Sequence, residues 1–195
     1  MAELRVARSE LVLGAGGAGR SARAEALAAA WIAAAPHHRA VCIDTAQPWD
    51  EELRDLIRRC RRASGGGSGP ALPRLEEPTE LAHALGQHSR PDTLIVVDCL
   101  GFWLTASLVH AMAPDESEAA AAGPARTLRM VDAVNACAGP LVLVSNCIDS
   151  EGVQARPDLQ RLVGTLGTLE QQAVAACERV TLMSAGLPLT LKDMG

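Results

Sequence analysis

The sequence has very few aromatic residues and almost no lysine. Aromatics make up 2% of its 195 residues, with three tryptophans, one phenylalanine and no tyrosine, so the core has to be built from Ala, Val, Leu and Ile. Lys192 is the single lysine among 18 basic residues. This preference for arginine extends over the whole chain, so an arginine at any one position is weak evidence of selection there.

Features that mark several special classes of protein are also missing. No apolar run approaches the roughly 18 residues of a membrane helix, and residues 1–10 show no secretory signal. The net charge of −5 argues against a general nucleic-acid coat. The six cysteines form no C-x-x-C pair, which argues against zinc and predicts buried, reduced thiols. We therefore expect a cytoplasmic protein with no membrane or nucleic-acid partner.

Short apolar runs alternate with helical stretches along the chain. A content of 48% hydrophobic and 21% charged residues is typical of a globular protein. The alternation predicts an α/β fold of three layers, a mostly parallel sheet with helices on both faces. We expect one domain over residues 1–195 with a flexible Gly/Ser loop at about 63–70. Strands are predicted at 10–13, 40–43, 93–98, 141–144, 180–183 and 189–191, and helices at 21–35, 50–62, 78–87, 102–112, 125–138 and 157–177.

A glycine-rich segment, GAGGAGRS, joins the first predicted strand to the first helix. It resembles the phosphate loop G-x-x-x-x-G-K-[ST], with Arg20 in the lysine place. Glycines in such a loop let backbone N–H groups surround phosphate oxygens, and the helix N-terminus adds partial positive charge. The alternative interpretation is a connection rich in Gly and Ala in a chain of that composition. We predict a domain similar to the P-loop nucleoside triphosphate hydrolases, with nucleotide bound by Gly14, Ala15, Gly16, Gly17, Ala18, Gly19, Arg20 and Ser21.

Two oxygen-bearing side chains are predicted to hold Mg²⁺. Ser21 ends the loop and Asp98 ends the most apolar strand, which are the positions of magnesium ligands in phosphate-loop enzymes. Taken alone, Asp98 has an alternative role as a helix cap. Arg20 and Asp98 are the candidate catalytic residues. A guanidinium is larger than an ammonium and planar, so arginine in the lysine place is not a conservative replacement.

The order of motifs along nearly the whole chain resembles the bifunctional adenosylcobinamide kinase/adenosylcobinamide-phosphate guanylyltransferase family. The family's G-G-x-x-S-G-K-S-x-x-A-E signature is similar to the loop and the start of the following helix. Its other motifs include a hydrophobic strand that ends in a carboxylate and a C-terminal segment that ends in lysine. The matching segments are residues 14–25, 43–47, 96–99, 104–108, 142–153 and 184–192.

The resemblance implies a role in cobalamin biosynthesis. The chain would transfer the γ-phosphate of ATP or GTP, with Mg²⁺, to the aminopropanol hydroxyl of adenosylcobinamide, a corrinoid small molecule. The resemblance also implies that Thr45, Ala46, Gln47, Glu77 and Asp98 line the nucleotide or substrate, and that the chain forms a trimer or another homo-oligomer.

The second activity of the family lacks its nucleophile in this sequence. The family forms a covalent GMP adduct on a histidine whose segment falls on Arg59, Cys60 and Arg61. A guanidinium is always protonated and cannot attack an α-phosphate. We therefore expect the guanylyltransferase step to be lost or moved to another residue. Two alternatives stay open: a catalytically degenerate relative that binds a nucleotide or a corrinoid, and a P-loop kinase for another metabolite.

Overall fold

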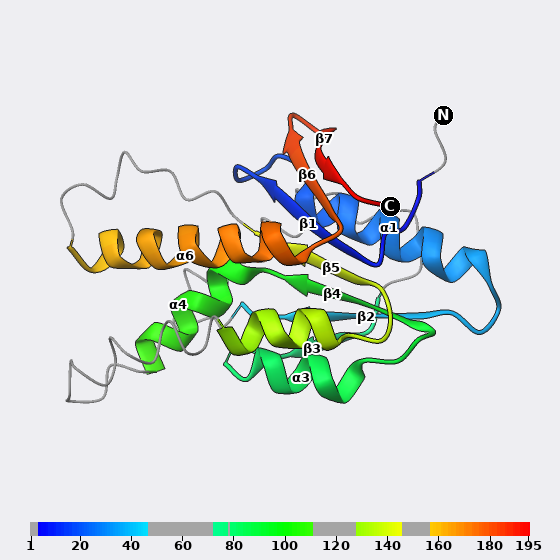
Figure 1. The fold of residues 1–195 in the computed structure, drawn as a ribbon, viewed down its shortest axis with the longest axis horizontal. Coiled ribbons are helices and arrows are strands. Elements are labelled where there is room, and N and C mark those ends of the chain that lie inside the picture. Colours follow the sequence, from blue (N-terminus) through cyan, green and yellow to red (C-terminus); the bar gives the residue numbers. More distant parts are fainter. Residues whose placement is uncertain (1–3, 47–71, 78, 111–127, 146–156) are drawn as a thin grey trace.

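A single mixed sheet organises the molecule, with strands in the order β3-β2-β4-β5-β1-β6-β7 (Figure 1). The computed structural model describes residues 4–46, 72–77, 79–110, 128–145 and 157–195. Within them, every neighbouring pair of strands from β3 to β6 is parallel, and β7 runs antiparallel to β6. The strands are β1 (Ser9–Gly14), β2 (Arg39–Asp44), β3 (Arg74–Glu76), β4 (Thr93–Asp98), β5 (Leu141–Val144), β6 (Arg179–Ser184) and β7 (Leu187–Asp193).

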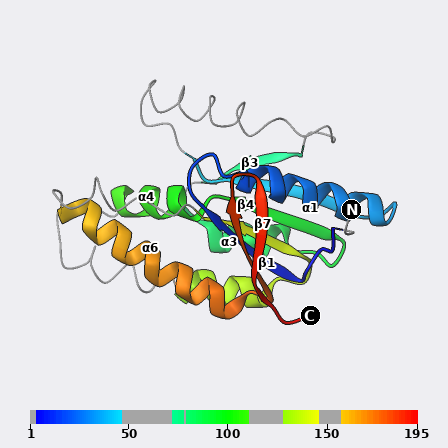
Figure 2. The same ribbon diagram turned by 90° about the horizontal axis from the view of Figure 1, so that it is seen from above.

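Helices cover both faces of this sheet (Figure 2). One face packs against α1 (Arg20–Ala34), which follows β1 directly. The other face packs against α3 (Leu81–His88), α4 (Leu100–His110), a helix over residues 128–136 and α6 (Pro157–Ala176). The three-layer α/β fold predicted from the alternation of strands and helices is confirmed.

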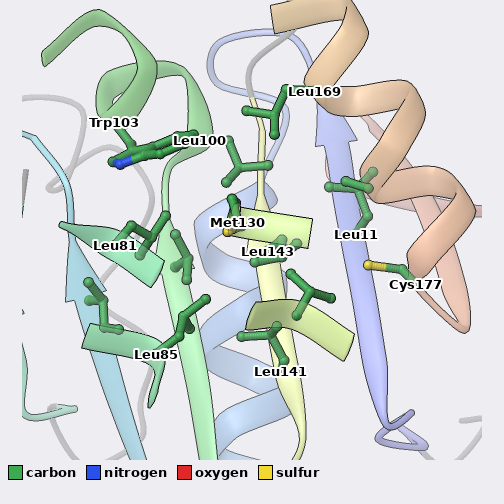
Figure 3. Packing of buried hydrophobic residues seen from close by; sticks show 14 of the residues in the cluster. Leu11, Leu81, Leu85, Leu100, Trp103, Met130, Leu141, Leu143, Leu169 and Cys177 are labelled. Atoms are coloured by element: carbon green, nitrogen blue, oxygen red, sulfur yellow. The ribbon is translucent and has the colours of Figure 1, made fainter. Parts of the chain in front are cut away.

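The central strands are apolar on both faces because each face packs into a different cluster of buried hydrophobic residues. In β1, Leu11 joins the larger cluster under α4 and α6, whereas Val12 joins the cluster under α1. Figure 3 shows Leu11 and Leu143 packed with Leu169 and other aliphatic side chains in the larger cluster. Successive residues of a strand point to opposite faces, so burial on both sides requires the unbroken apolar runs seen in the sequence.

The short strand β3 was not predicted from the sequence. This strand has three residues, pairs with Cys42–Asp44 of β2, and has no buried residue. It therefore lacks the apolar run by which the other strands were recognised. The predicted helix at 50–62 and the Gly/Ser loop at 63–70 lie outside the described residues, and the single-domain organisation stays a prediction.

The cysteines of the described ranges behave as small hydrophobic residues. Cys42, Cys99, Cys137 and Cys177 are buried and form no disulfide. Burial raises the pKa of the Cys42 and Cys99 thiols to about 12, so both are protonated at neutral pH. Among the helices that the structure describes, none is long and apolar enough to cross a membrane.

Candidate functional site

The segment between β1 and α1 passes over the carboxyl end of β1 as a glycine-dependent loop. Gly14 has a φ of +152°, and a Cβ atom there would lie 2.7 Å from the carbonyl oxygen of Met183. Gly19 has a φ of +92° directly before the first helical residue. Other residues rarely adopt such backbone angles. Ala15, Gly16 and Gly17 are exposed, which leaves the backbone of the loop open to a ligand.

The loop is held by a neighbouring turn and leads into a helix whose N-cap residue is a glycine. The Gly186 N–H, in the turn between β6 and β7, donates to the Ala18 carbonyl oxygen at 3.1 Å. At the start of α1, the N-cap residue Gly19 makes no side-chain cap hydrogen bond, and the first turn carries no acidic residue. Free N–H groups and the helix dipole make such a terminus a binding site for anions.

Ser21 and Asp98 meet at this edge of the sheet. The Ser21 side chain hydrogen-bonds to Asp98, which ends β4. Burial raises the pKa of the Asp98 carboxyl, and nearby Asp44 raises it further, while the Ser21 hydrogen bond and the charges of Arg74 and Arg20 lower it. A hydroxyl and a carboxylate are the hard oxygen ligands that Mg²⁺ prefers. This donor pair therefore fits a magnesium ion, and its binding of the metal stays a prediction.

Arg20 connects the phosphate loop to Ser145, the residue that follows β5. Its Nη1 donates to the Ser145 carbonyl oxygen at 2.6 Å, and the Ser145 hydroxyl donates to Oε1 of Glu170 on α6 at 2.7 Å. Ser145 is fully buried. Burial raises the pKa of the Glu170 carboxyl, and its hydrogen bond with Ser145 and the charge of Arg20 lower it. Neither partner was among the predicted site residues: Ser145 lies in the matched segment 142–153 without an assigned role, and Glu170 belongs to no motif.

A second carboxylate, Asp44, lies beside Asp98. The two residues occupy the same register position on the paired strands β2 and β4. Asp44 is 4% exposed, and its Oδ2 lies 3.7 Å from Nη1 of Arg74, whose Nη2 lies 3.1 Å from Oε1 of Glu25 on α1. Asp44 was not among the predicted site residues, although an acid at the end of an apolar strand is the same signal that identified Asp98.

The remaining predicted site residues lie around this edge with largely structural contacts. The Thr45 hydroxyl accepts from the Cys99 N–H at 2.9 Å and donates to the Cys99 carbonyl oxygen at 2.6 Å. The Ala46 N–H donates to Asp44 Oδ1 at 3.1 Å. The Glu77 carboxylate accepts from two backbone N–H groups ahead of α3. Gln47 lies outside the described residues, and contact of these residues with a nucleotide stays a prediction.

A buried ion cluster anchors the first turns of α1 to the sheet. Glu10 of β1 is 1% exposed. Its Oε1 accepts from Nε of Arg23 at 2.7 Å and from the Thr181 hydroxyl at 2.8 Å, and its Oε2 lies 3.7 Å from Nη1 of Arg179. Because Arg23 is two residues beyond Ser21, this cluster fixes the helix turn that carries the predicted magnesium ligand.

A cavity at the opposite edge of the sheet is separate from the phosphate loop. It measures about 520 Å³, and its lining includes Arg39 and Thr93, the first residues of β2 and β4. His38 also lines it, stacked on Trp31 with ring centroids 3.6 Å apart. The pair His37–His38 thus lies away from the loop and has no contact with it in the described structure.

The chain is similar to proteins of cobalamin biosynthesis. Residues 10–191 match the family described as cobinamide kinase / cobinamide phosphate guanyltransferase. A relative from Pseudomonas aeruginosa, the bifunctional adenosylcobalamin biosynthesis protein CobP, is 34% identical over 186 residues, which cover 94% of this chain and 96% of the relative.

Comparison of structures gives the fold alone. A solved ATPase domain has a TM-score of 0.52 and 12% identity, over 98% of this chain and 78% of that chain. A protein from Pyrococcus horikoshii OT3 has a TM-score of 0.47 and 11% identity, over 98% of this chain and 89% of that chain.

Proposed function

Because this chain belongs to the cobinamide kinase / cobinamide phosphate guanyltransferase family, we propose that it binds a nucleoside triphosphate at the carboxyl edge of β1, β4 and β5. It is a nucleotide-dependent transferase of cobalamin biosynthesis, and its acceptor is a corrinoid, adenosylcobinamide. The observation that supports this placement is the contact of Ser21 with Asp98 beside the glycine-rich loop that precedes α1.

In the proposed kinase reaction the chain acts by positioning and charge neutralisation. The loop amides from Gly14 to Gly19 bind the β- and γ-phosphates, and Arg20 faces the charge that develops during transfer. Ser21 and Asp98 would hold Mg²⁺, which when bound neutralises phosphate charge. The acceptor hydroxyl oxygen bonds to the γ-phosphorus as the bond to the bridging oxygen breaks, its proton passes to solvent, and the nucleoside diphosphate leaves.

The second activity of the family remains without an identified nucleophile. The expected position, Arg59–Arg61, lies outside the described residues and carries no histidine. We propose that the guanylyltransferase step is absent or uses another residue. Incubation with GTP labelled at the α-phosphate tests this: acid-labile label on the chain that is lost in a single histidine variant would identify the nucleophile, and absence of label would support loss of the step.

The kinase assignment is tested by following label from γ-labelled ATP or GTP into adenosylcobinamide with Mg²⁺. Transfer should disappear in Ser21→Ala and Asp98→Asn and persist in Asp132→Asn, which changes an exposed carboxylate on the 128–136 helix in the same way. Nucleotide binding without transfer would favour a degenerate relative. Transfer to a different acceptor would favour a kinase for another metabolite.

We also propose that the protein acts in the cytoplasm as a homo-oligomer without nucleic-acid partners. Support for assembly comes from β7, the last strand of the sheet, where Leu187, Leu189 and Leu191 are 72%, 58% and 56% exposed. Exposed apolar edge strands are rarely left uncovered. Light scattering should show an oligomer that Leu189→Glu weakens, and a monomer at all concentrations would contradict this proposal.

A further inference from the structure

Arg20 in the phosphate loop makes contacts that orient its guanidinium. A lysine ammonium would not need to be oriented in this way. The Arg20 guanidinium reaches across the end of β5, where Nη1 donates to the Ser145 carbonyl oxygen at 2.6 Å. An ammonium is a compact point charge, whereas a guanidinium is planar and carries five donors in a fixed fork. Its orientation therefore decides which donors face a bound phosphate.

The acceptor of that hydrogen bond is itself fixed by two elements. The Ser145 N–H donates to the Val12 carbonyl oxygen of β1 at 3.0 Å, and the Ser145 hydroxyl donates to Glu170 Oε1 at 2.7 Å. Ser145 is 0% exposed. A residue held in this way by β1 and α6 provides a rigid support for the guanidinium.

Glu170 adds a negative charge at the end of this chain of contacts. Its carboxyl is close enough to Arg20 for the guanidinium to lower its pKa, and Arg20 has the same effect on Asp98. The guanidinium therefore interacts electrostatically with both carboxyl groups, and its hydrogen-bonded connection to Glu170 runs through Ser145. Asp98 is assigned to Mg²⁺, whereas Glu170 is connected to the arginine through Ser145.

We propose that Glu170 is a positioning residue that, together with Ser145, orients Arg20 so that an arginine works where phosphate loops carry lysine. This inference rests on the proposed kinase function. Glu170 does not touch the phosphates in this proposal. It holds one side of the guanidinium so that the opposite side points toward the transferred phosphoryl group.

The test compares four proteins: the wild type, Glu170→Gln, Arg20→Lys and the double variant. Glutamine keeps the oxygen that accepts the Ser145 hydroxyl and removes only the charge. We expect Glu170→Gln to lower kcat about tenfold, equivalent to about 1.4 kcal/mol, with the KM for nucleotide nearly unchanged. In the Arg20→Lys background the same substitution should change kcat less than about twofold, since an ammonium needs no orientation.

A merely structural role predicts a different pattern. It would lower kcat by the same factor in both backgrounds, together with a lower melting temperature, and this result would overturn the proposal. Asp132→Asn is the matched control, because it converts an exposed carboxylate on the same face of the sheet to an amide. It should leave kcat and the ¹⁵N signal of the Arg20 side chain unchanged.

A second readout does not depend on activity. In protein labelled with ¹⁵N-arginine, the Arg20 side-chain signal, assigned by its loss in Arg20→Lys, should show a restricted guanidinium in the wild type and faster rotation in Glu170→Gln. An unchanged signal would refute the positioning role. If the wild type transfers no phosphate, the proposed function fails, while this signal and the calorimetric affinity for Mg–ATP still decide the role of Glu170.

Discussion

Replacing Asp98 by asparagine should stabilise the ligand-free protein while removing its reaction. Asparagine has nearly the same shape but carries no charge. Burial and the neighbouring Asp44 raise the pKa of the Asp98 carboxyl above its ordinary value of 3.8, so the folded state disfavours the ionised form. Each pKa unit of such a shift corresponds to about 1.4 kcal/mol of unfolding free energy.

The sign of the pH dependence of stability follows from how many protons Asp98 binds in the folded and unfolded states. Between pH 3.8 and the raised pKa of Asp98, the folded state binds more protons than the unfolded state, so stability falls as pH rises through this window. Above it, the full cost of the buried charge is present. The advantage of Asp98→Asn should therefore be largest near pH 7 and should vanish below pH 3.8. For a chain of this length ~1 kcal/mol corresponds to about 2–4 °C in Tm.

Thermal melts with and without Mg–ATP give the decisive comparison. Ligand at ~100 times its Kd stabilises by about 2.7 kcal/mol, so the wild type should gain several degrees and Asp98→Asn far less. The order of the two melting temperatures is then reversed by the ligand. A variant that is less stable than the wild type at pH 7 without ligand, or that gains as much from Mg–ATP, would refute the assignment of Asp98 as a destabilising magnesium ligand.

Three further substitutions probe the elements that support the site. Glu10→Ala leaves the half-buried Arg23 and the buried Arg179 without their shared carboxylate, while Arg179 keeps its ion pair with Asp193; chemical denaturation should show a loss of about 1–3 kcal/mol, and a loss under ~0.5 kcal/mol would contradict the cluster's role. Gly14→Ala forces a Cβ atom to 2.7 Å from the Met183 carbonyl oxygen, so calorimetry should show more than about tenfold weaker nucleotide binding. Lys192→Arg should lower Tm by about 2–4 °C for each ~1 kcal/mol of hydrogen bonding lost, and an unchanged Tm would show that a guanidinium can replace this ammonium.

The fold could be predicted from the sequence because its central strands are buried on both faces. Thr93–Asp98 and Leu141–Val144 are nearly continuous apolar runs, and the helices between strands enforce parallel pairing. The strand Arg74–Glu76 escaped prediction because edge strands bury little and carry no such run. Its position at the end of the sheet order comes from pairing with β2, which no local pattern encodes.

The candidate site could be predicted only where a motif fixes the spacing. The loop and Ser21 are contiguous, and Asp98 ends the clearest strand. By contrast, Ser145 and Glu170 come to Arg20 through the order of strands and the path of α6. Arg20 and Ser145 are 125 positions apart, and such a contact depends on tertiary packing. Sequence reasoning therefore reached the loop but not the groups that orient its arginine.

The single lysine of the chain, Lys192, lies where the geometry of its acceptors suits an ammonium better than a guanidinium. Nζ of Lys192 donates to the carbonyl oxygens of Val174, Ala175 and Cys177 at 2.7, 3.1 and 2.7 Å, where α6 ends. Three converging acceptors suit the three donors of a compact ammonium better than a planar guanidinium. Lysine is thus present where the acceptors converge on one point. At position 20 the guanidinium donates to the carbonyl oxygen of Ser145, a residue that is itself hydrogen-bonded to Glu170, and so the arginine there is compatible with a working loop.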